Sequence, residues 1–172
     1  YLKKKYGFSL LFITHDLSIV SELSNTVVTM YAGRVVENSP TRDFFETPRH
    51  PYSNGLINAI PRLSMDSSNI YSIPGSPPDM IDIKTGCPFA PRCYRRLDKC
   101  NLEMPPLKMV DPQTEPVPAG TQSMNGSEMT DLINLTGLGK AFSQKNSPPI
   151  TILRDINLTI GKCETLCVLG ES

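Results

Sequence analysis

Apolar residues recur in short runs near the amino end of the chain, and their spacing predicts alternating strands and a helix. The run at 8–13 has the length of one buried strand, and the segment 17–23 after it has the spacing of a short helix. The pattern at 26–31, the turn at 32–33 and the apolar positions at 34–37 predict a β-hairpin. This end of the chain therefore has the strand and helix content of an α/β domain.

Two short amphipathic helices are predicted after the hairpin. Ser39-Pro40 would supply the cap and the first position of a helix that runs through 45. A second helix is expected from 52 to 60, where Pro61 ends it. Tyr52 and the residue one turn later face the same side, so both helices should pack on a core.

The middle of the chain loses this periodicity. Of 16 prolines, 11 lie between Pro61 and Pro118, so the segment from 63 to about 128 cannot be mostly helix or central strand. Since it has no apolar pattern, we expect something other than a hydrophobic core to hold it. The small polar residues at 122–128 have linker composition, and a new strand pattern begins near Met129.

The carboxyl end is predicted to form strands. Apolar residues at 132–138 suggest one strand, and Ile156, Leu158 and Ile160 alternate as expected of a half-buried one. The continuous apolar run at 165–169 is typical of a fully buried strand.

Charge and hydropathy exclude some function classes. The 172 residues include 17 basic and 17 acidic side chains, so no overall electrostatic attraction to nucleic acid is expected. The apolar runs are far shorter than the roughly 20 residues that span a bilayer, and the first residues lack a signal peptide's apolar core. We therefore expect a soluble, intracellular chain.

Both ends carry candidate phosphate-binding residues. His15 follows the first strand, and ligands of open α/β sheets bind at the carboxyl ends of strands. Asp16 is suited to cap the next helix. Gly170-Glu171-Ser172 follows the last strand and matches the start of the phosphate-binding motif Gly-x-x-x-x-Gly-Lys-Ser/Thr. An ordinary turn would explain these three residues equally well.

The cysteines suggest a metal site. Their number, five, is odd, and Cys87, Cys93 and Cys100 cluster in a segment without a predicted core. Three alternatives remain for this trio: an iron–sulfur cluster, a zinc or partial site, and free thiols. Cys163 and Cys167 flank or lie in the last strand and are expected to pack.

Basic residues surround the cysteine trio. Arg92, Arg95, Arg96 and Lys99 predict a solvated face, or alternatively a set of charges that compensates an anionic thiolate cluster. His50 precedes Pro51 at a helix start, where local packing or capping is expected rather than metal binding.

Several strings resemble a known family. Residues 13–17 (ITHDL) and 30–37 (MYAGRVVE) resemble the switch-histidine segment and the following hairpin of ATP-binding cassette (ABC) nucleotide-binding domains. Residues 153–162 resemble the approach to the phosphate-binding strand of another such domain. The strings at 50–61, 73–79 and 86–93 resemble the carboxy-terminal extension of ATPase subunits of oligopeptide, dipeptide and nickel importers.

The resemblance implies an α/β fold made of incomplete ABC nucleotide-binding domain pieces, joined by a Pro-rich, Cys-containing irregular segment. Residues 1–62 would end a first nucleotide-binding domain and begin its extension, and 63–121 would complete that extension. Residues 122–128 would be a linker, and 129–172 would begin a second domain. The parent would then be a fused protein with two cassettes.

The family's chemistry implies the cofactors ATP and Mg²⁺. His15 would contact the γ-phosphate, Gly170, Glu171 and Ser172 would belong to the phosphate loop, and Phe142 would stack on adenine. A four-iron cluster would be held by Cys87, Cys93 and Cys100, with its fourth cysteine missing. The lysine of the phosphate loop, the magnesium carboxylate, the catalytic glutamate and the signature segment lie outside this sequence, so the piece alone is not expected to hydrolyse ATP.

The resemblance also implies partners. A peptide importer's ATPase works at the cytoplasmic face of the membrane with a second nucleotide-binding domain and transmembrane permease subunits, and indirectly with an extracytoplasmic solute-binding protein. The alternative function is a metal-binding regulatory or interaction module. A third possibility is that no independent fold forms, because each flanking piece would expose a sheet edge.

Overall fold

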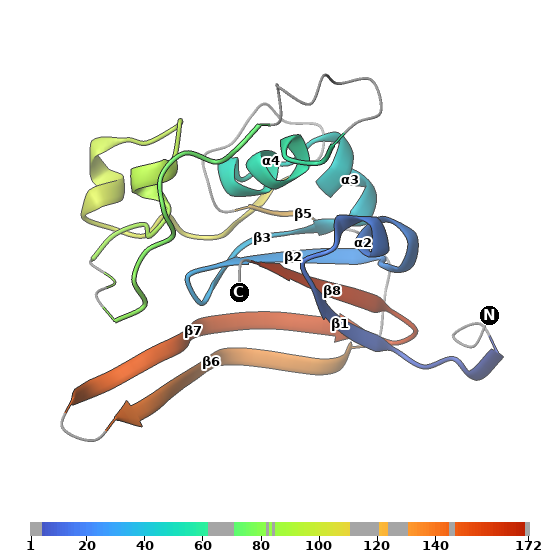
Figure 1. Cartoon of the computed structure of the whole chain (residues 1–172). Helices are drawn as coiled ribbons and strands as arrows, with labels where there is room; N and C mark the ends of the chain where they lie inside the picture. The colour runs from blue at the N-terminus through green and yellow to red at the C-terminus, as the bar shows by residue number, and fades with distance from the viewer. Residues whose placement is uncertain are drawn as a thin grey trace.

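The computed structural model describes residues 5–61, 71–81, 83, 85–110, 121–123, 131–144 and 147–170. Its strands form one six-stranded sheet in the order β1-β8-β2-β3-β5-β4 and one two-stranded sheet, β6-β7 (Figure 1). The mixed α/β character expected from the sequence is confirmed. The elements in chain order are β1 (Leu10–Thr14), α2 (Leu17–Leu23), β2 (Thr26–Tyr31), β3 (Arg34–Pro40), α3 (Thr41–Glu46), α4 (Pro51–Asn58), the 3₁₀ turns η2 (Ala90–Arg92) and η3 (Asp98–Asn101), β4 (Lys108–Val110), β5 (Thr121–Ser123), β6 (Asp131–Gln144), β7 (Ser147–Gly161) and β8 (Thr165–Gly170).

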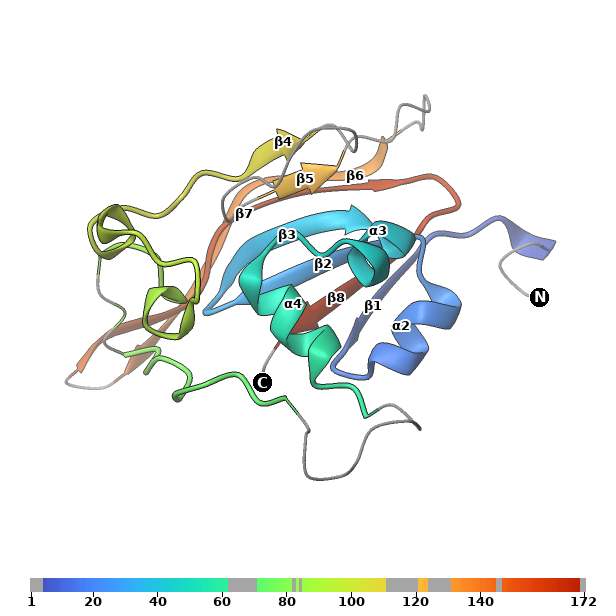
Figure 2. The ribbon, with the colours of Figure 1, turned by 90° about the horizontal axis from the view of Figure 1, so that it is seen from above.

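The elements lie in three layers. The helices α2, α3 and α4 cover one face of the six-stranded sheet, and the long hairpin of β6 and β7 lies against the other (Figures 1 and 2). The sheet is therefore buried on both faces near its centre. Strands in such a position need apolar side chains in continuous runs rather than in alternation, which matches the sequence of β2 and β8.

Side chains of the central strands point alternately to the two faces of the sheet, and this divides the core around these strands into two clusters. Val27 and Cys167 point to the helices and pack with Val20 and Phe44. Their neighbours in sequence point to the opposite face, because successive strand side chains alternate. That second cluster lies under the hairpin and consists of Val28, Ile156, Leu158, Ile160 and Leu166. The predicted half-buried alternation along β7 is confirmed by this set.

The carboxy-terminal strand lies inside the sheet formed by the amino-terminal elements. β8 pairs in parallel with β1, Leu10 opposite Thr165 through Thr14 opposite Leu169, and in parallel with β2 on its other side. The Asn25 backbone and side chain both bond to Thr165, at 2.8 and 2.9 Å. The proposed division of the chain at 122–128 stays a prediction, while the two flanking pieces share this sheet.

The start of β8 is fixed by one buried carboxylate. Glu164 is 7% exposed; its Oε2 accepts a hydrogen bond from the Gly161 amide at 2.6 Å, and its Oε1 accepts one from the Thr26 hydroxyl. Charged acceptors give the stronger class of hydrogen bond. The turn before β8 is thereby tied to the first residue of β2.

The local predictions near the amino end are confirmed, apart from one helix start. The turn at Ala32-Gly33 joins β2 and β3 in an antiparallel hairpin. The helix α3 begins at Thr41 rather than at Pro40, because β3 extends through Pro40. Ser39 therefore lies in a strand, and its buried hydroxyl has no hydrogen-bond partner among the described residues. The expected cap at this position was wrong.

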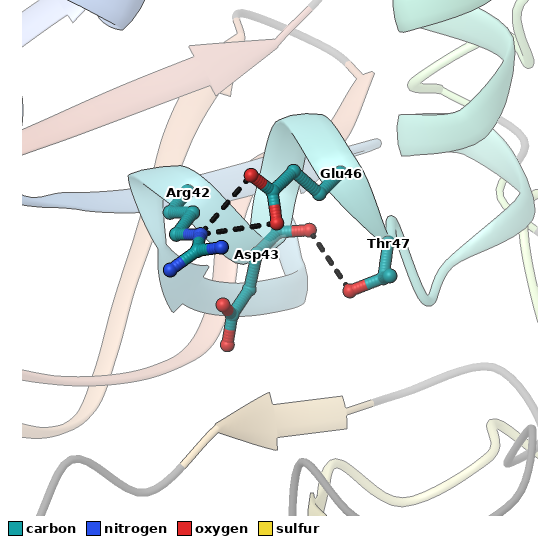
Figure 3. A network of polar contacts seen from close by, with 4 residues as sticks. All are labelled: Arg42, Asp43, Glu46 and Thr47. Carbon is teal, nitrogen blue, oxygen red and sulfur yellow. Dashed lines mark hydrogen bonds and ion pairs between the residues drawn. The ribbon is translucent and has the colours of Figure 1, made fainter.

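The exposed side of α3 carries an ion pair one turn apart. Arg42 Nε lies 3.0 Å from Glu46 Oε1, and the Thr47 hydroxyl donates to the Asp43 carbonyl at the helix end (Figure 3). The Glu46 carboxylate raises the pKa of Arg42 by this hydrogen bond. Such exposed pairs contribute little to stability. The buried Phe44 is the residue of α3 that joins it to the core.

A hydrophobic cluster holds part of the middle segment, contrary to the expectation from its sequence. Phe89 is 1% exposed and packs against Tyr31 and Tyr52, with ring centroids 5.0 and 5.5 Å apart. Cys87, Cys93 and Met104 adjoin this cluster. This segment has no periodic apolar pattern, because 3₁₀ turns and loops, not a helix or strand, present these side chains.

The predicted linker lies partly outside the described residues. Gln122 and Ser123 belong to β5, whereas 124–128 lie outside the described residues. Before β1, Lys5 and Tyr6 are helical. Within the described ranges, none of the helices combines the length and the apolar character needed to cross a membrane.

Candidate functional site

Residues from opposite ends of the chain line one pocket. His15 follows β1 and Gly170 ends β8, and the parallel pairing of these strands places their carboxyl ends side by side. Both residues line a pocket of about 600 Å³. This is the position and the size range in which open α/β sheets bind small molecules. The pocket brings together two of the residues predicted to bind phosphate.

The backbone next to His15 is fixed by its neighbours rather than by the imidazole. The Asp16 amide donates to the Thr14 hydroxyl at 3.0 Å, and Asp16 Oδ1 accepts from the Ser18 amide at 2.9 Å. The hydrogen bond from Ser18 lowers the pKa of Asp16. Asp16 therefore caps α2, as predicted. The exposed His15 imidazole makes no hydrogen bond to another described residue and borders the pocket.

Gly170 lets β8 and β2 approach each other closely at the edge of the pocket. A Cβ atom added to Gly170 would lie 2.8 Å from the Met30 carbonyl oxygen, so a larger residue would displace β2 or β8. Glu171 and Ser172, the other predicted phosphate-loop residues, lie outside the described residues.

Phe142, the predicted adenine platform, is not among the residues that line this pocket. It lies in β6 opposite Ile150, is 55% exposed, and has the Lys140 ammonium 5.2 Å from its ring centroid. The hairpin contributes Ile152 and Leu153 to the pocket instead. The stacking role of Phe142 therefore stays a prediction that the geometry does not support.

Sequence reasoning missed two walls of the pocket. One is the hairpin turn at Gly33, whose carbonyl accepts from the Arg154 amide at 2.8 Å and so fixes the turn against β7. The other consists of Pro77, Pro78 and Met80, which follow α4. The Pro-Pro pair was visible in the sequence, but nothing in the sequence placed it near His15.

The three clustered cysteines line a second pocket, of about 530 Å³. The Cys87 amide donates to the Cys100 carbonyl at 2.8 Å, which brings the two ends of this segment together. Burial raises the pKa of the Cys87 and Cys93 thiols, and the neighbouring thiols add to this effect. Neutral thiols must lose their protons before they bind a metal.

The geometry does not complete a metal site. Across the described ranges, no group of three or more His, Cys, Asp or Glu side chains is placed to hold a metal ion. All five cysteines are free thiols. The trio as placed therefore does not fit a cluster or a zinc ion. Cys167 is buried, as predicted, but Cys163 is exposed on a turn, so the expectation that it packs was wrong.

The basic residues beside the cysteines take different roles. Arg95 and Lys99 are exposed and border the cysteine pocket, as a solvated face would. Arg92 is only 9% exposed, and its guanidinium donates to the Pro74 carbonyl at 3.0 Å and to the Tyr31 hydroxyl at 3.2 Å. The prediction of a solvated face was therefore wrong for Arg92, because the chain folds back over this side chain.

His50 caps α4 and closes one side of the cysteine pocket. It is 2% exposed, its Nδ1 accepts from the Tyr52 amide at 3.1 Å, and its own amide donates to Glu37 Oε2 at 2.9 Å. Glu37 also accepts from the Arg49 amide at 3.0 Å. Burial lowers the pKa of His50 to about 3 and raises that of Glu37. The predicted capping role of His50 is confirmed.

Comparison with known proteins shows a family likeness over part of the chain. Residues 36–100 match the family described as "Oligopeptide/dipeptide transporter, C-terminal region". The chain is 43% identical over 111 residues to the oligopeptide transport ATP-binding protein OppD of Salmonella typhimurium, which covers 64% of this chain and 33% of that protein.

Two further relatives agree with this likeness. The oligopeptide transport ATP-binding protein AppD of Bacillus subtilis is 43% identical over 106 residues, which is 62% of this chain and 32% of AppD. A putative peptide import ATP-binding protein of Brucella ovis is 40% identical over 116 residues, which is 64% of this chain and 34% of that protein. The chain thus spans about a third of the length of these curated relatives.

Proposed function

We propose that the chain is part of an ATP-binding subunit of a peptide ABC importer, because residues 36–100 match the C-terminal region of the oligopeptide/dipeptide transporter family. The observation that carries the proposal is the pocket shared by His15 and Gly170. Two segments that resemble opposite halves of a nucleotide-binding domain supply one strand end each. Their meeting at one edge of a sheet is what a nucleotide site requires.

Each side chain in the pocket has a chemically reasonable role toward ATP. The His15 imidazole can donate a hydrogen bond to a phosphate oxygen without introducing a permanent charge. Any side chain at Gly170 would meet the Met30 carbonyl of β2, so glycine keeps the two strand ends together beside the pocket. Bound ATP with Mg²⁺ would supply the phosphoryl group whose transfer to water drives transport. The described residues of this chain bind and orient the phosphates.

The substrate, partners and location of the parent protein are part of the proposal. Its relatives are named for oligopeptide transport and peptide import, so the solute is a peptide. Permease subunits and a second nucleotide-binding domain would complete the importer, with the ATPase at the cytoplasmic face of the membrane. A solute-binding protein outside the membrane would deliver the peptide.

A nucleotide titration of this chain tests the proposal. The two histidines, His15 and His50, give separate imidazole signals in a nitrogen-15 NMR spectrum. Addition of ATP with Mg²⁺ should shift the His15 signal and leave that of the buried His50 in place. The affinity for ATP should fall in His15→Ala, which removes the imidazole from the pocket without adding atoms between the paired strands. Absence of any shift at His15 would count against a nucleotide site in this pocket.

Hydrolysis is a separate question. We expect phosphate release from ATP by this chain to be no faster than that of a His15→Ala control, because a γ-phosphate contact alone supplies neither the metal clamp nor the base of phosphoryl transfer. Turnover above that control would show that the chain carries a complete catalytic set.

The second candidate function, a metal-binding interaction module, rests on the three thiols that line one pocket. It would need these side chains to rearrange, since none of the described groups is placed to hold a metal. A brown protein whose visible absorption is lost in Cys93→Ser, or zinc that copurifies in equal amount with the chain, would support it. A colourless, zinc-free preparation would favour free thiols.

A further inference from the structure

The segment 73–80 forms one wall of the His15 pocket although it has no helix or strand of its own. Pro77, Pro78 and Met80 line the pocket opposite the strand ends. In Figure 2 the green segment that begins at residue 71 runs past the carboxyl end of β8. A loop without the backbone hydrogen bonds of a helix or strand needs other contacts to keep one position. The side-chain hydrogen bonds that hold segment 73–80 therefore decide the shape of the pocket.

Arg92 makes those bonds. Its Nε donates to the Pro74 carbonyl at 3.0 Å and its Nη2 to the Ile73 carbonyl at 3.4 Å, so one guanidinium holds two successive carbonyls. Gly75 follows with φ +75°, and a Cβ there would lie 3.5 Å from Arg92 Cγ. The segment therefore turns around the Arg92 side chain just before it reaches the pocket.

The same guanidinium contacts the opposite wall. Its Nη1 donates to the Tyr31 hydroxyl at 3.2 Å, and its centre lies 5.9 Å from the Tyr31 ring centroid. Tyr31 ends β2 and itself lines the pocket. Arginine suits this task because its planar fork carries several donors in fixed directions, which lysine cannot reproduce.

Arg92 is in turn held by the cysteine segment. It ends the turn η2, which begins at the buried Ala90 after the buried Phe89, and it directly precedes Cys93. Phe89 packs edge-on against Tyr31. The position of the guanidinium thus depends on how the cysteine segment is seated on the sheet, and the position of segment 73–80 depends on the guanidinium.

We propose that Arg92 is a positioning residue for the nucleotide pocket: it fixes segment 73–80 as a wall beside His15 and thereby sets the affinity for nucleotide. This inference rests on the proposed function of the pocket. It links the cysteine segment mechanically to the nucleotide, so that a change in the seating of that segment alters nucleotide binding without any contact between the two.

Methionine methyl groups offer a direct readout. Met80 and Met30 line the pocket from segment 73–80 and from β2, and carbon-13 labelling of their methyl groups gives a separate NMR signal for each. The experiment compares the whole chain with Arg92→Met, which keeps most of the stem volume, with Arg92→Lys, which keeps the charge, and with Arg96→Met. Arg96 is the matched control, since it is exposed and bonds locally to Asn101 at 2.8 Å.

In Arg92→Met we expect the Met80 signal to move toward its value in unfolded chain while Met30 shifts less. The dissociation constant for ATP with Mg²⁺ should rise about tenfold, which corresponds to the loss of roughly 1.4 kcal/mol of pocket contacts. Arg92→Lys should show the same changes to a smaller extent, and Arg96→Met should show neither. If Arg92→Met fails to fold, the comparison of Arg92→Lys with Arg96→Met decides the question.

The possible failures are distinguishable. An unmoved Met80 signal in a folded Arg92 variant would overturn the positioning role, and a moved Met80 signal with unchanged nucleotide affinity would overturn its effect on binding. If the unsubstituted chain binds no nucleotide, the proposed function of the pocket fails and the effect on affinity fails with it. The Met80 signal still tests whether Arg92 positions the segment.

Discussion

The buried imidazole of His50 should make the stability of this protein depend on pH. The side chain is 2% exposed, its Nδ1 accepts the Tyr52 amide, and its ring centroid lies 5.5 Å from that of Phe89. Burial lowers the pKa of His50 from 6.5 to about 3. Near neutral pH the folded protein therefore holds this imidazole uncharged, with Nδ1 available as the helix cap.

The direction of the effect follows from proton binding. The unfolded chain protonates His50 below about pH 6.5, whereas the folded protein resists protonation until about pH 3. The contribution of the neutral imidazole is fully present above pH 6.5 and is lost as the pH falls toward 3. At about 1.4 kcal/mol per pH unit, the free energy of unfolding should fall by about 2 kcal/mol between about pH 7.5 and about pH 5.

The raised pKa of Glu37 changes the free energy of unfolding with pH in the opposite direction, so the experiment must compare proteins that share this contribution. Burial raises the pKa of Glu37, so its contribution is present below the pKa of the unfolded chain and is lost as the pH rises through the higher folded value. Comparison with His50→Asn cancels the contribution of Glu37, because the backbone amide of residue 50, which donates to Glu37, remains in the variant. Asparagine also keeps an acceptor at the helix cap.

Urea unfolding followed by circular dichroism at both pH values measures the effect. The fall in unfolding free energy on acidification should be about 2 kcal/mol larger for the unsubstituted chain than for His50→Asn. The exposed His15 provides the matched control, since His15→Asn should keep the full dependence on pH. An equal dependence in the unsubstituted chain and His50→Asn would refute the argument that burial keeps His50 neutral.

Two further predictions concern the sheet. Gly33→Ala should lower the free energy of unfolding by about 1–3 kcal/mol, because Gly33 has φ +72° and a Cβ there would lie 2.0 Å from the Ile152 carbonyl oxygen. Gly139→Ala, whose Cβ would lie 3.5 Å from the Leu153 carbonyl oxygen, should cost much less in the same urea assay. In hydrogen exchange, the amides of β8 should exchange more slowly than those of β6, because β8 pairs with a strand on each side. Rapid exchange along β8 would indicate that the two ends of the chain do not share a stable sheet.

Short-range features of this protein follow from its sequence. The hairpin needed only two apolar runs and a turn that contains glycine, and the helix caps at Asp16 and His50 needed only a suitable acceptor before a helical segment. Each of these depends on hydrogen bonds between residues a few positions apart. Pro40 shows the limit, because pairing with β2 kept it in a strand where local preference predicted a helix.

Features that depend on distant packing could not be predicted in this way. Arg92 has the sequence neighbourhood of a solvated basic face, yet it is buried because segment 73–80 folds back over it and Phe89 anchors its turn among the tyrosines. Phe142 lies on the exposed part of the hairpin and outside the residues that line the His15 pocket, and its stacking role stays a prediction. No local pattern records which distant residues will cover a side chain.

The candidate site combines both kinds of information. The amino-acid sequence alone indicates that His15 follows one strand and that Gly170 ends another, because continuous apolar runs stop at both points. That these strand ends lie together is seen only in the folded chain, where β8 enters between β1 and β2 and its two faces are buried between the helices and the hairpin. Burial on both faces and hydrogen bonding on both edges are properties of the assembled sheet, and no single segment has them.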